Sequence, residues 1–585
     1  MPRRRLSLKG RMNARRWGWA VVGLAVLWLL LGGYQLVRAR SELNNAVKAT
    51  DRARKRLTPA SVVDGRAAVE LEKARSRFAS AHRRTSGPSV LAIRLLPVLG
   101  RQVRSISALS GAAAEVADIG VLGLADARQT LAGKPVGGSA KVAELRSLAA
   151  IATRTDQALA GVDLGPKAGL LGPIASKRAS LEDKLAEVRS GAQRGAAAAT
   201  AVADLLQGPR RYLLLAANNS EMRAGSGMFL SIGVLSSANG SIHLAEMKPA
   251  GDLTLPGDGV PIDDPDLAAR WGWLHPGREW RNLGASPRFD ATAPLAAKMW
   301  TARTGEKLDG VLALDAAAVS GVLDGTGPIN VGTTRIDSRN VEDILLHDQY
   351  FAYPDESADQ SARREQLGVI AASALDAMDR GSYDLGRLAS GLAHAARGRH
   401  VLAWSSHPAE LKGWEAAGIS GTMTPDSVMV SVLNRAGNKL DHFVAMTAHL
   451  DLRPVANGTD ATITVDLRNT TPPGQPQYVA GPHPGSGVGA GVYKGIVTVE
   501  LPRRVGDISI EGKPPLQASG PDGPSQVTAT EVTINPGANA TVVIHFRLAD
   551  RHGVLRVEPD ARIPVTRWYS GRVRWWADES HTVHW

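Results

Sequence analysis

The chain of 585 residues contains no cysteine, and only 5% of its residues are aromatic. The lack of cysteine excludes disulfide bonds, thiolate nucleophiles and cysteine-ligated metals, although it does not fix the cellular compartment. A chain of this length needs more than one hydrophobic core, because single cores rarely grow beyond about 250–300 residues. We therefore expect several domains, and we expect no thiol redox chemistry.

The net charge of +13 and the sequence pI of about 10 would by themselves favour nucleic acid as a partner. The charge is unevenly distributed, however. Residues 1–37 carry seven cations and no acid, residues 38–84 carry thirteen cations against five acids, and the rest of the chain has a net charge near −2. Cations beside an apolar segment match anionic lipid headgroups better than nucleic acid. We expect a membrane as a partner and no nucleic acid.

The apolar segment spans residues 17–37 (WGWAVVGLAVLWLLLGGYQLV) and contains no charged side chain. At 1.5 Å per residue, a helix of this length would span about 30 Å, the thickness of one bilayer core. Trp17, Trp19 and Tyr34 lie near its ends, and the preceding cations favour a cytoplasmic tail over residues 1–16. A cleaved signal peptide is the alternative, but no A-x-A site follows. We predict an uncleaved transmembrane helix in the cell membrane, with the main body extracytoplasmic.

Residues 41–207 are rich in alanine, leucine and charged side chains, with apolar residues at helical spacing. Ala67, Leu71 and Ala74 follow the i, i+4, i+7 pattern of one helix face. The region ends at Gly208-Pro209, where proline cannot continue a helix. We predict an all-α bundle or stalk without chemistry, in which alanine permits close helix packing.

The chain after residue 208 predicts two further domains. The whole chain is therefore expected to be a multidomain α+β protein. Residues 209–404 predict a mixed α/β core, in which Asn239-Gly240 between alternating apolar residues indicates a hairpin. Residues 421–559 alternate with a period of two and carry frequent turn residues, which favours a β-sandwich. The aromatic and basic tail, residues 560–585, is expected to add a last strand to the sandwich, with membrane or glycan contact as the alternative.

The segment NNSEMRAGSGMFLS, residues 218–231, combines polar side chains with glycines at the mouth of a predicted strand. Gly225 and Gly227 would expose backbone N–H groups, and Arg223 would add a planar guanidinium, an arrangement that suits an anion. The alternative is a local ion pair between Glu221 and Arg223 in a loop whose glycines merely permit a bend. The candidate anion site of this segment comprises Asn219, Glu221, Arg223, Gly225, Ser226 and Gly227.

Other polar motifs carry less information. His347, His394 and His400 lack the i, i+4 spacing of paired metal ligands, so we interpret them as surface or core histidines. The segment GSGVGAG, residues 485–491, has no following helix and is expected to be a flexible loop rather than a phosphate-binding loop.

The string RYLLLAANNSEMRAGSGMFLSIGVLSSANGSI, which starts at Arg211, resembles the signature of the bacterial family called domain of unknown function 4012. Residues 308–331, 401–421 and 431–441 resemble later blocks of that family in the same order. The resemblance covers roughly residues 211–548. It implies a shared fold but supplies no activity.

The order of these blocks is also similar to the LytR-CpsA-Psr family, whose members sit on one membrane span and move glycopolymers from polyprenyl-pyrophosphate carriers onto peptidoglycan. This resemblance implies arginines on the pyrophosphate, acids that hold magnesium, and an apolar groove for the lipid tail. It assigns Arg223 to phosphate and adds Arg363, Arg364 and Gln366. It leaves Asp348 and Asp359 as the acids for a metal.

Two departures from that family reduce the expectation of catalysis. Its Ser-Asp-Thr turn corresponds to Ser226-Gly227-Met228, and no arginine stands between Asn340 and Ala362, where the family has Arg-x-Arg. We therefore expect a single-pass, extracytoplasmic cell-envelope protein that binds an anionic lipid-linked or wall polymer, such as a polyprenyl phosphate or a cell-wall glycan. The alternatives are a phosphotransferase acting on a polyprenyl-pyrophosphate carrier, which would need Mg²⁺, and a non-catalytic scaffold. Whether the chain is an enzyme stays open.

Overall fold

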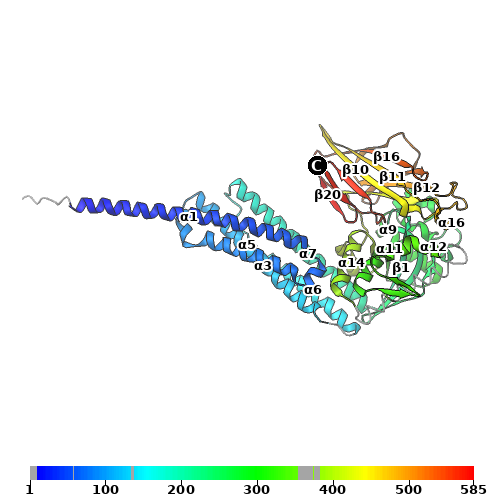
Figure 1. Cartoon of the computed structure of the whole chain (residues 1–585), viewed down its shortest axis with the longest axis horizontal. Coiled ribbons are helices and arrows are strands. Elements are labelled where there is room, and N and C mark those ends of the chain that lie inside the picture. The colour runs from blue at the N-terminus through cyan, green and yellow to red at the C-terminus, as the bar shows by residue number, and fades with distance from the viewer. Residues whose placement is uncertain (1–8, 57, 134–136, 353–369, 371–372, 374–382) are drawn as a thin grey trace, which may run out of the picture. The chain divides into compact units, whose positions relative to one another are not determined.

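The computed structural model describes residues 9–56, 58–133, 137–352, 370, 373 and 383–585 (Figure 1). Helices account for 47% of the chain and strands for 26%, which confirms the mixed α+β class. The chain divides into two compact units, each described by itself below. The first contains residues 1–133 and 147–196, and the second contains residues 134–146 and 197–585.

The secondary structure that the described residues of the first unit form is helical. Alanines spaced by seven residues are buried on α1 and α3, where Ala67, Ala74 and Ala81 have no exposed surface. Such small side chains allow the two helix backbones to approach closely. The helices that lie wholly or partly in this unit are α1 (Lys9–Arg56), α2 (Pro59–Val63), α3 (Arg66–Ser86), η1 (Pro88–Val90), α4 (Leu91–Arg94), α5 (Leu99–Leu131), α6 (Gly138–Ala160) and α7 (Gly172–Gln207).

One described helix, α5, is long and apolar enough to cross a membrane, by length and composition alone. Its contacts fit a bundle helix better, because Asp118 forms an ion pair with Arg75 of α3 at 3.0 Å (Oδ1–Nη1). The backbone of the predicted span, residues 17–37, is continuous helix within α1. The side chains of residues 17–27 lie outside the described part, as do residues 1–8 of the predicted tail, so the anchor stays a prediction.

A mixed sheet organises the predicted α/β core of the second unit. Its strand order is β3-β2-β1-β5-β8, with β4 beside β2. β1 pairs antiparallel with β2 and parallel with β5. Asn239 and Gly240 have φ of 51° and 81° between β2 and β3, which confirms the predicted hairpin. The strands are β1 (Arg210–Met222), β2 (Gly227–Ala238), β3 (Ser241–Leu244), β4 (Lys248–Pro249), β5 (Gly310–Leu314) and β8 (Val401–Ser405).

The two faces of this sheet have different coverings. Leu213, Leu215 and Val311 join one hydrophobic core with Trp271 and Trp280. This core contains residues of α8 (Pro265–Trp271), η4 (Trp280–Ala285) and α9 (Phe289–Thr304), with η2 (Ala250–Leu253) beside them and η3 (Gly272–Leu274) following α8. The alternate residues of β1 point to the other face, because side chains alternate along a strand.

Further elements of the core region lie beyond β5. They are α10 (Ala316–Thr326), β6 (Ile329–Val331), β7 (Thr334–Ile336), α11 (Val341–Asp343), the π-helix η5 (Ile344–Asp348), α12 (Gln349–Ala352), α14 (Leu385–Arg397) and α15 (Pro408–Ala417).

The rest of the second unit is a β-sandwich, shown in yellow to red in Figure 1. One sheet has the order β13-β16-β11-β10-β18-β19 and the other β14-β15-β12-β9-β17-β20. Val432, Ile463, Val499 and Ile544 lie between the sheets and are at most 1% exposed. The elements are β9 (Ser427–Asn434), η6 (Leu440–Phe443), β10 (Val444–Val455), β11 (Gly458–Asn469), α16 (Gln477–Ala480), β12 (Tyr493–Pro502), β13 (Gly506–Ile510), β14 (Leu516–Asp522), β15 (Ser525–Ile534), β16 (Asn539–Leu548), β17 (Val554–Val557), β18 (Arg567–Ser570), β19 (Val573–Trp576) and β20 (His581–His584). The predicted tail thus supplies three strands rather than one.

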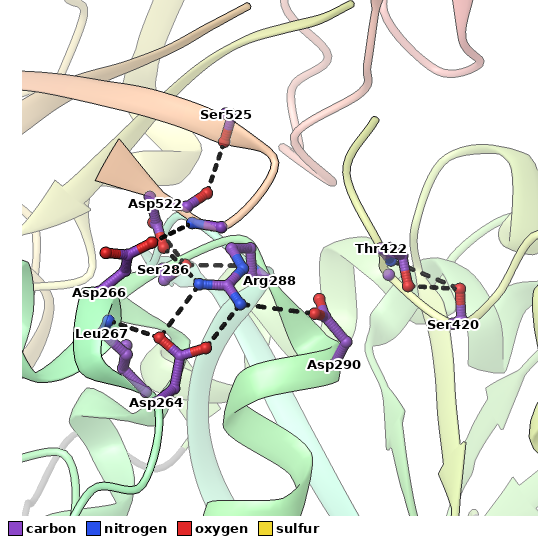
Figure 2. Close-up of polar contacts among 12 residues, drawn as sticks. Asp264, Asp266, Leu267, Ser286, Arg288, Asp290, Ser420, Thr422, Asp522 and Ser525 are labelled. Carbon is purple, nitrogen blue, oxygen red and sulfur yellow. Dashed lines mark hydrogen bonds and ion pairs between the residues drawn. The ribbon is translucent and has the colours of Figure 1, made fainter. Parts of the chain in front are cut away.

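A cluster of charges around Arg288 joins the α/β core to the sandwich (Figure 2). The Arg288 guanidinium is ion-paired with Asp264 at 2.7 Å (Nη2–Oδ2) and with Asp522 of β14 at 2.9 Å (Nη1–Oδ1). Nearby, buried Glu500 accepts a hydrogen bond from Ser525 Oγ at 2.6 Å. Burial and the neighbouring Asp522 raise the pKa of Glu500 well above its usual value. The joint between the two parts therefore contains a buried carboxyl group whose charged form is disfavoured.

We expect Glu500→Gln to stabilise the protein at about pH 8. The pKa of Glu500 is raised above its usual 4.5 in the folded state, so its contribution to stability is present below pH 4.5 and is lost as the pH rises toward the folded pKa. Glutamine does not titrate, so its contribution to stability does not change over this pH range. The gain should therefore be present near pH 8 and should vanish near pH 4.5. Urea unfolding at both pH values measures it, and a variant that is less stable than wild type at pH 8 would contradict the assignment.

Candidate ligand-binding site

The turn between β1 and β2 is tightly packed. Arg223 N–H donates to Ser226 O at 2.8 Å, and Gly225 N–H donates to Gly284 O at 3.0 Å. A Cβ atom at Gly227 would lie 2.3 Å from the carbonyl carbon of Asn218, so only glycine fits there. The structure thus differs from the expected anion-binding rim, because the Gly225 N–H is already bonded and Gly225, Ser226 and Gly227 are buried.

Arg223 is buried and bonded mainly to backbone carbonyls. Its Nε donates to Arg281 O at 3.0 Å, and its Nη1 donates to Met222 O and Asn434 O, both at 2.9 Å. None of the carboxylates that the structure describes forms an ion pair with it. Burial lowers the pKa of Arg223 to about 10, although the group stays protonated at neutral pH. The predicted local ion pair with Glu221 is therefore wrong.

Glu221 instead pairs with Lys439, a residue from the segment that follows β9. Lys439 Nζ lies 2.6 Å from Glu221 Oε2, and both side chains are buried. The ammonium group also lies over two rings, 4.4 Å from the centroid of Tyr478 and 5.4 Å from that of Tyr350. Burial opposes the charge of Lys439, but Glu221 raises its pKa above the usual value. Tyr350 accepts a hydrogen bond from Asn218 Nδ2 at 2.9 Å, and burial raises its pKa to about 12.

Asn219 is fully buried and supports the start of α10. Its Nδ2 donates to Asp315 Oδ2 at 2.8 Å, while Asp315 Oδ1 accepts from the N–H groups of Ala317 and Ala318 as a helix cap. Asp315 also lies 2.6 Å from His400 Nδ1. Burial disfavours the charge on His400, but Asp315 and Asp578 raise its pKa to about 10. Asn219 thus has a structural role, and His400 is a core histidine.

A pocket of about 640 Å³ lies beside these groups, on the second face of the mixed sheet. Leu214 and Ala216 of β1 and Leu314 of β5 belong to its wall. The apolar part of the wall comprises Leu214, Ala216, Met228, Leu230, Leu244, Met247, Leu314, Ala316, Val319, Leu345, Leu346 and Ile370. The charged part, called the charged end below, comprises Glu221, Arg223, Glu279, Arg281, Arg435 and Lys439.

The charged end has two more positive than negative groups. Its two carboxylates are already paired, Glu221 with Lys439 and Glu279 with Arg281 at 2.6 Å (Oε2–Nη2). Arg223 and Arg435 form no ion pair with any described carboxylate. Arg435 is half-buried, and its Cζ lies 5.4 Å from the centroid of the Trp273 ring.

Two more acids line the pocket outside the charged end. Asp315 is paired with protonated His400, and Asp252 is exposed to solvent. Neither acid is both buried and unpaired, so neither cancels the two extra positive charges of the charged end.

Of the remaining predicted site residues, Asp348 is the one in the described part of the chain, and it does not line this pocket. Arg363, Arg364, Gln366 and Asp359 lie outside the described residues, so their convergence with Arg223 stays a prediction. Asp348 is exposed and lies 2.8 Å from His347 Nδ1. In the part of the chain that the structure describes, no three or more His, Asp or Glu residues are placed to hold a metal ion. Sequence reasoning missed Arg435 and Lys439, although both stand in the block at residues 431–441 that carries the family resemblance.

The comparisons with known proteins support one family. The model of the family described as Protein of unknown function (DUF4012) matches residues 207–350, about a quarter of the chain. This match confirms the resemblance to domain of unknown function 4012 over residues 207–350, while the resemblance of residues 401–421 and 431–441 stays a prediction. The LytR-CpsA-Psr similarity is not shown by the comparisons. No significant match to a curated protein or to a solved structure is found.

We expect Lys439→Met to destabilise the protein by about 3–5 kcal/mol, because it leaves the buried Glu221 carboxylate without its partner. The double variant Lys439→Met/Glu221→Gln removes both charges and should recover most of that loss. Urea unfolding of the single and double variants measures the coupling. If the single variant is as stable as wild type, the buried ion pair is not present in solution.

Proposed function

We propose that the pocket binds an amphiphile with an anionic headgroup and a long apolar chain, such as a lipid-linked precursor of a cell-envelope polymer. In this proposal residues 17–37 anchor the protein in the cell membrane with a cytoplasmic N-terminus, and the pocket lies on the extracytoplasmic side. The headgroup occupies the charged end, and the chain lies along the apolar wall.

The observation that carries the proposal is the combination of an apolar wall with unpaired cations in one pocket. Its volume of about 640 Å³ is within the range of ligand sites. Each buried CH₂ group contributes about 0.8 kcal/mol, so ten such groups would contribute roughly 8 kcal/mol before the cost of association. A charged hydrogen bond contributes about 1.5–3 kcal/mol. The apolar chain therefore supplies most of the affinity, and the cations select the anion.

The same geometry favours binding over phosphoryl transfer. Both carboxylates of the charged end are in ion pairs, so neither could ligate a metal without breaking its pair. A transferase would draw its metal ligands and further arginines from residues such as Asp359, Arg363 and Arg364, which lie outside the described part of the chain. We retain phosphoryl transfer as the alternative function. In both functions, the first step is binding of the amphiphile in the pocket.

Arg435→Gln tests the headgroup contact. Farnesyl phosphate and farnesol serve as probes for the full-length protein in detergent, with binding followed by titration calorimetry. We expect the variant to bind farnesyl phosphate at least about tenfold more weakly, since one charged hydrogen bond is lost. Farnesol binding should be unchanged, because farnesol has no phosphate. Arg223→Ala is a poorer test, because it also removes hydrogen bonds that hold the β1–β2 turn.

Two further variants make this experiment decisive. Leu230→Glu places a charge on the apolar wall and should weaken both probes. Arg504→Gln makes the same charge change at an exposed arginine outside the pocket and should alter neither. Equal binding of farnesyl phosphate by wild type, Arg435→Gln and Leu230→Glu would contradict the proposed function and leave a scaffold role.

A further inference from the structure

A second surface with chemistry of its own lies on the outward face of the sandwich, at β18, β19 and the neighbouring strand β10. The register pairs Arg567 with Trp576 and Tyr569 with Arg574, and these four side chains share one face because they alternate with inward-facing neighbours. His449 of β10 pairs with Tyr569 and extends the same face. These five residues are called the aromatic-basic face below.

The rings of the aromatic-basic face lie on a well-packed sheet. The rings of His449 and Tyr569 are stacked, with centroids 4.7 Å apart and an interplanar angle of 9°. Behind this face, Trp568 is 1% exposed in the sandwich core and stacks on Trp575. Trp576 is 56% exposed, although Arg567 Cζ lies 4.6 Å from its ring centroid. The sheet thus presents a fixed, solvent-facing aromatic surface.

The charge of the β18–β19 hairpin is positive, although Asp451 of β10 and Asp466 of β11 lie on the same outward face of the neighbouring strands. Arg567, Arg572 and Arg574 are exposed, and residues 567–576 contain no acid. None of the three arginines forms an ion pair with a carboxylate among the residues that the structure describes. The next acids along the chain are engaged elsewhere, since Asp578 contacts His394 and His400, and Glu579 contacts Arg397.

We propose that the aromatic-basic face binds an acidic polysaccharide. The C–H faces of sugar rings are apolar and pack on aromatic rings, while guanidinium groups bind carboxylates in a bidentate manner. Thr447, Thr462 and Thr464 alternate on neighbouring strands of the same outward face and add hydroxyl groups for sugar hydroxyls. The outward face of a sheet accommodates an extended polymer.

The shape of the β18–β19 hairpin favours a glycan over a bilayer. Insertion into a bilayer needs several projecting apolar side chains, but the turn between the two strands consists of Gly571 and Arg572, and only Val573 and Trp576 of β19 are large, apolar and strongly exposed. The acidic polysaccharide is therefore the partner whose chemistry matches both the rings and the arginines. This site is separate from the pocket and does not depend on the proposed function.

Binding of the full-length protein to three immobilised polymers tests the proposal. Polygalacturonate carries sugar rings and carboxylates, dextran carries sugar rings alone, and polyglutamate carries carboxylates alone. We expect retention on polygalacturonate that weakens with salt, little retention on dextran, and at least about fivefold weaker binding to polyglutamate than to polygalacturonate. Equal retention on polyglutamate and polygalacturonate would overturn the proposal, because it would show attraction by charge alone.

Single substitutions measure the contributions of the aromatic rings and of the arginines to polygalacturonate binding separately. Trp576→Ala should weaken polygalacturonate binding at least about fivefold, and so should Arg567→Gln or Arg574→Gln. These side chains are exposed, so circular dichroism and the melting temperature should stay at the wild-type values. Arg504→Gln is the matched charge control, and Arg435→Gln should also leave polygalacturonate binding intact because it alters only the pocket. Unchanged binding by folded Trp576→Ala, or no binding by wild type, would overturn the proposal.

Discussion

The pocket of the second unit depends on the buried charges at the end of the β1–β2 hairpin. Glu221 and Arg223 are each 5% exposed, and removing such ions from water costs several kcal/mol per group unless they are compensated. The compensation comes from distant parts of the chain. Lys439 pairs with Glu221, and the carbonyls of Arg281 and Asn434 accept from Arg223. These contacts connect the hairpin end to η4 and to the sandwich.

These contacts also shape the pocket. The partners of the hairpin end come from the sandwich and from η4. They fix the charged end beside the apolar wall, to which β1, β2, β5, α10 and η5 contribute. Arg223 supplies positive potential from a position that its backbone acceptors hold, so it needs no rearrangement to act on an anion. Arg435 is half-buried, has no carboxylate partner among the described residues, and supplies the guanidinium that an anion can approach. The proposed site for an anionic amphiphile is thus built from the same contacts that satisfy the buried charges of the fold.

Local patterns in the sequence predicted much of the architecture but little of this site. The spacing of Ala67 and Ala74 indicated a closely packed helix, and Asn239-Gly240 indicated the hairpin, because both signals lie within a few residues. The partners Glu221 and Lys439 are 218 residues apart, and Asp315 and His400 are 85 apart, so no local pattern reveals them. The spacing of Gly225 and Gly227 is equally consistent with an open anion rim and with a packed turn. Tertiary contacts alone distinguish the two.

Photo-crosslinking with an isoprenoid phosphate that carries a diazirine on its apolar chain tests the central claim most directly. If the charged end and the apolar wall form one ligand site, the labelled peptides should come from β1, β2 and α10, and excess unlabelled isoprenoid phosphate should abolish the labelling. Labelling confined to other segments, or labelling that the competitor does not reduce, would contradict the account.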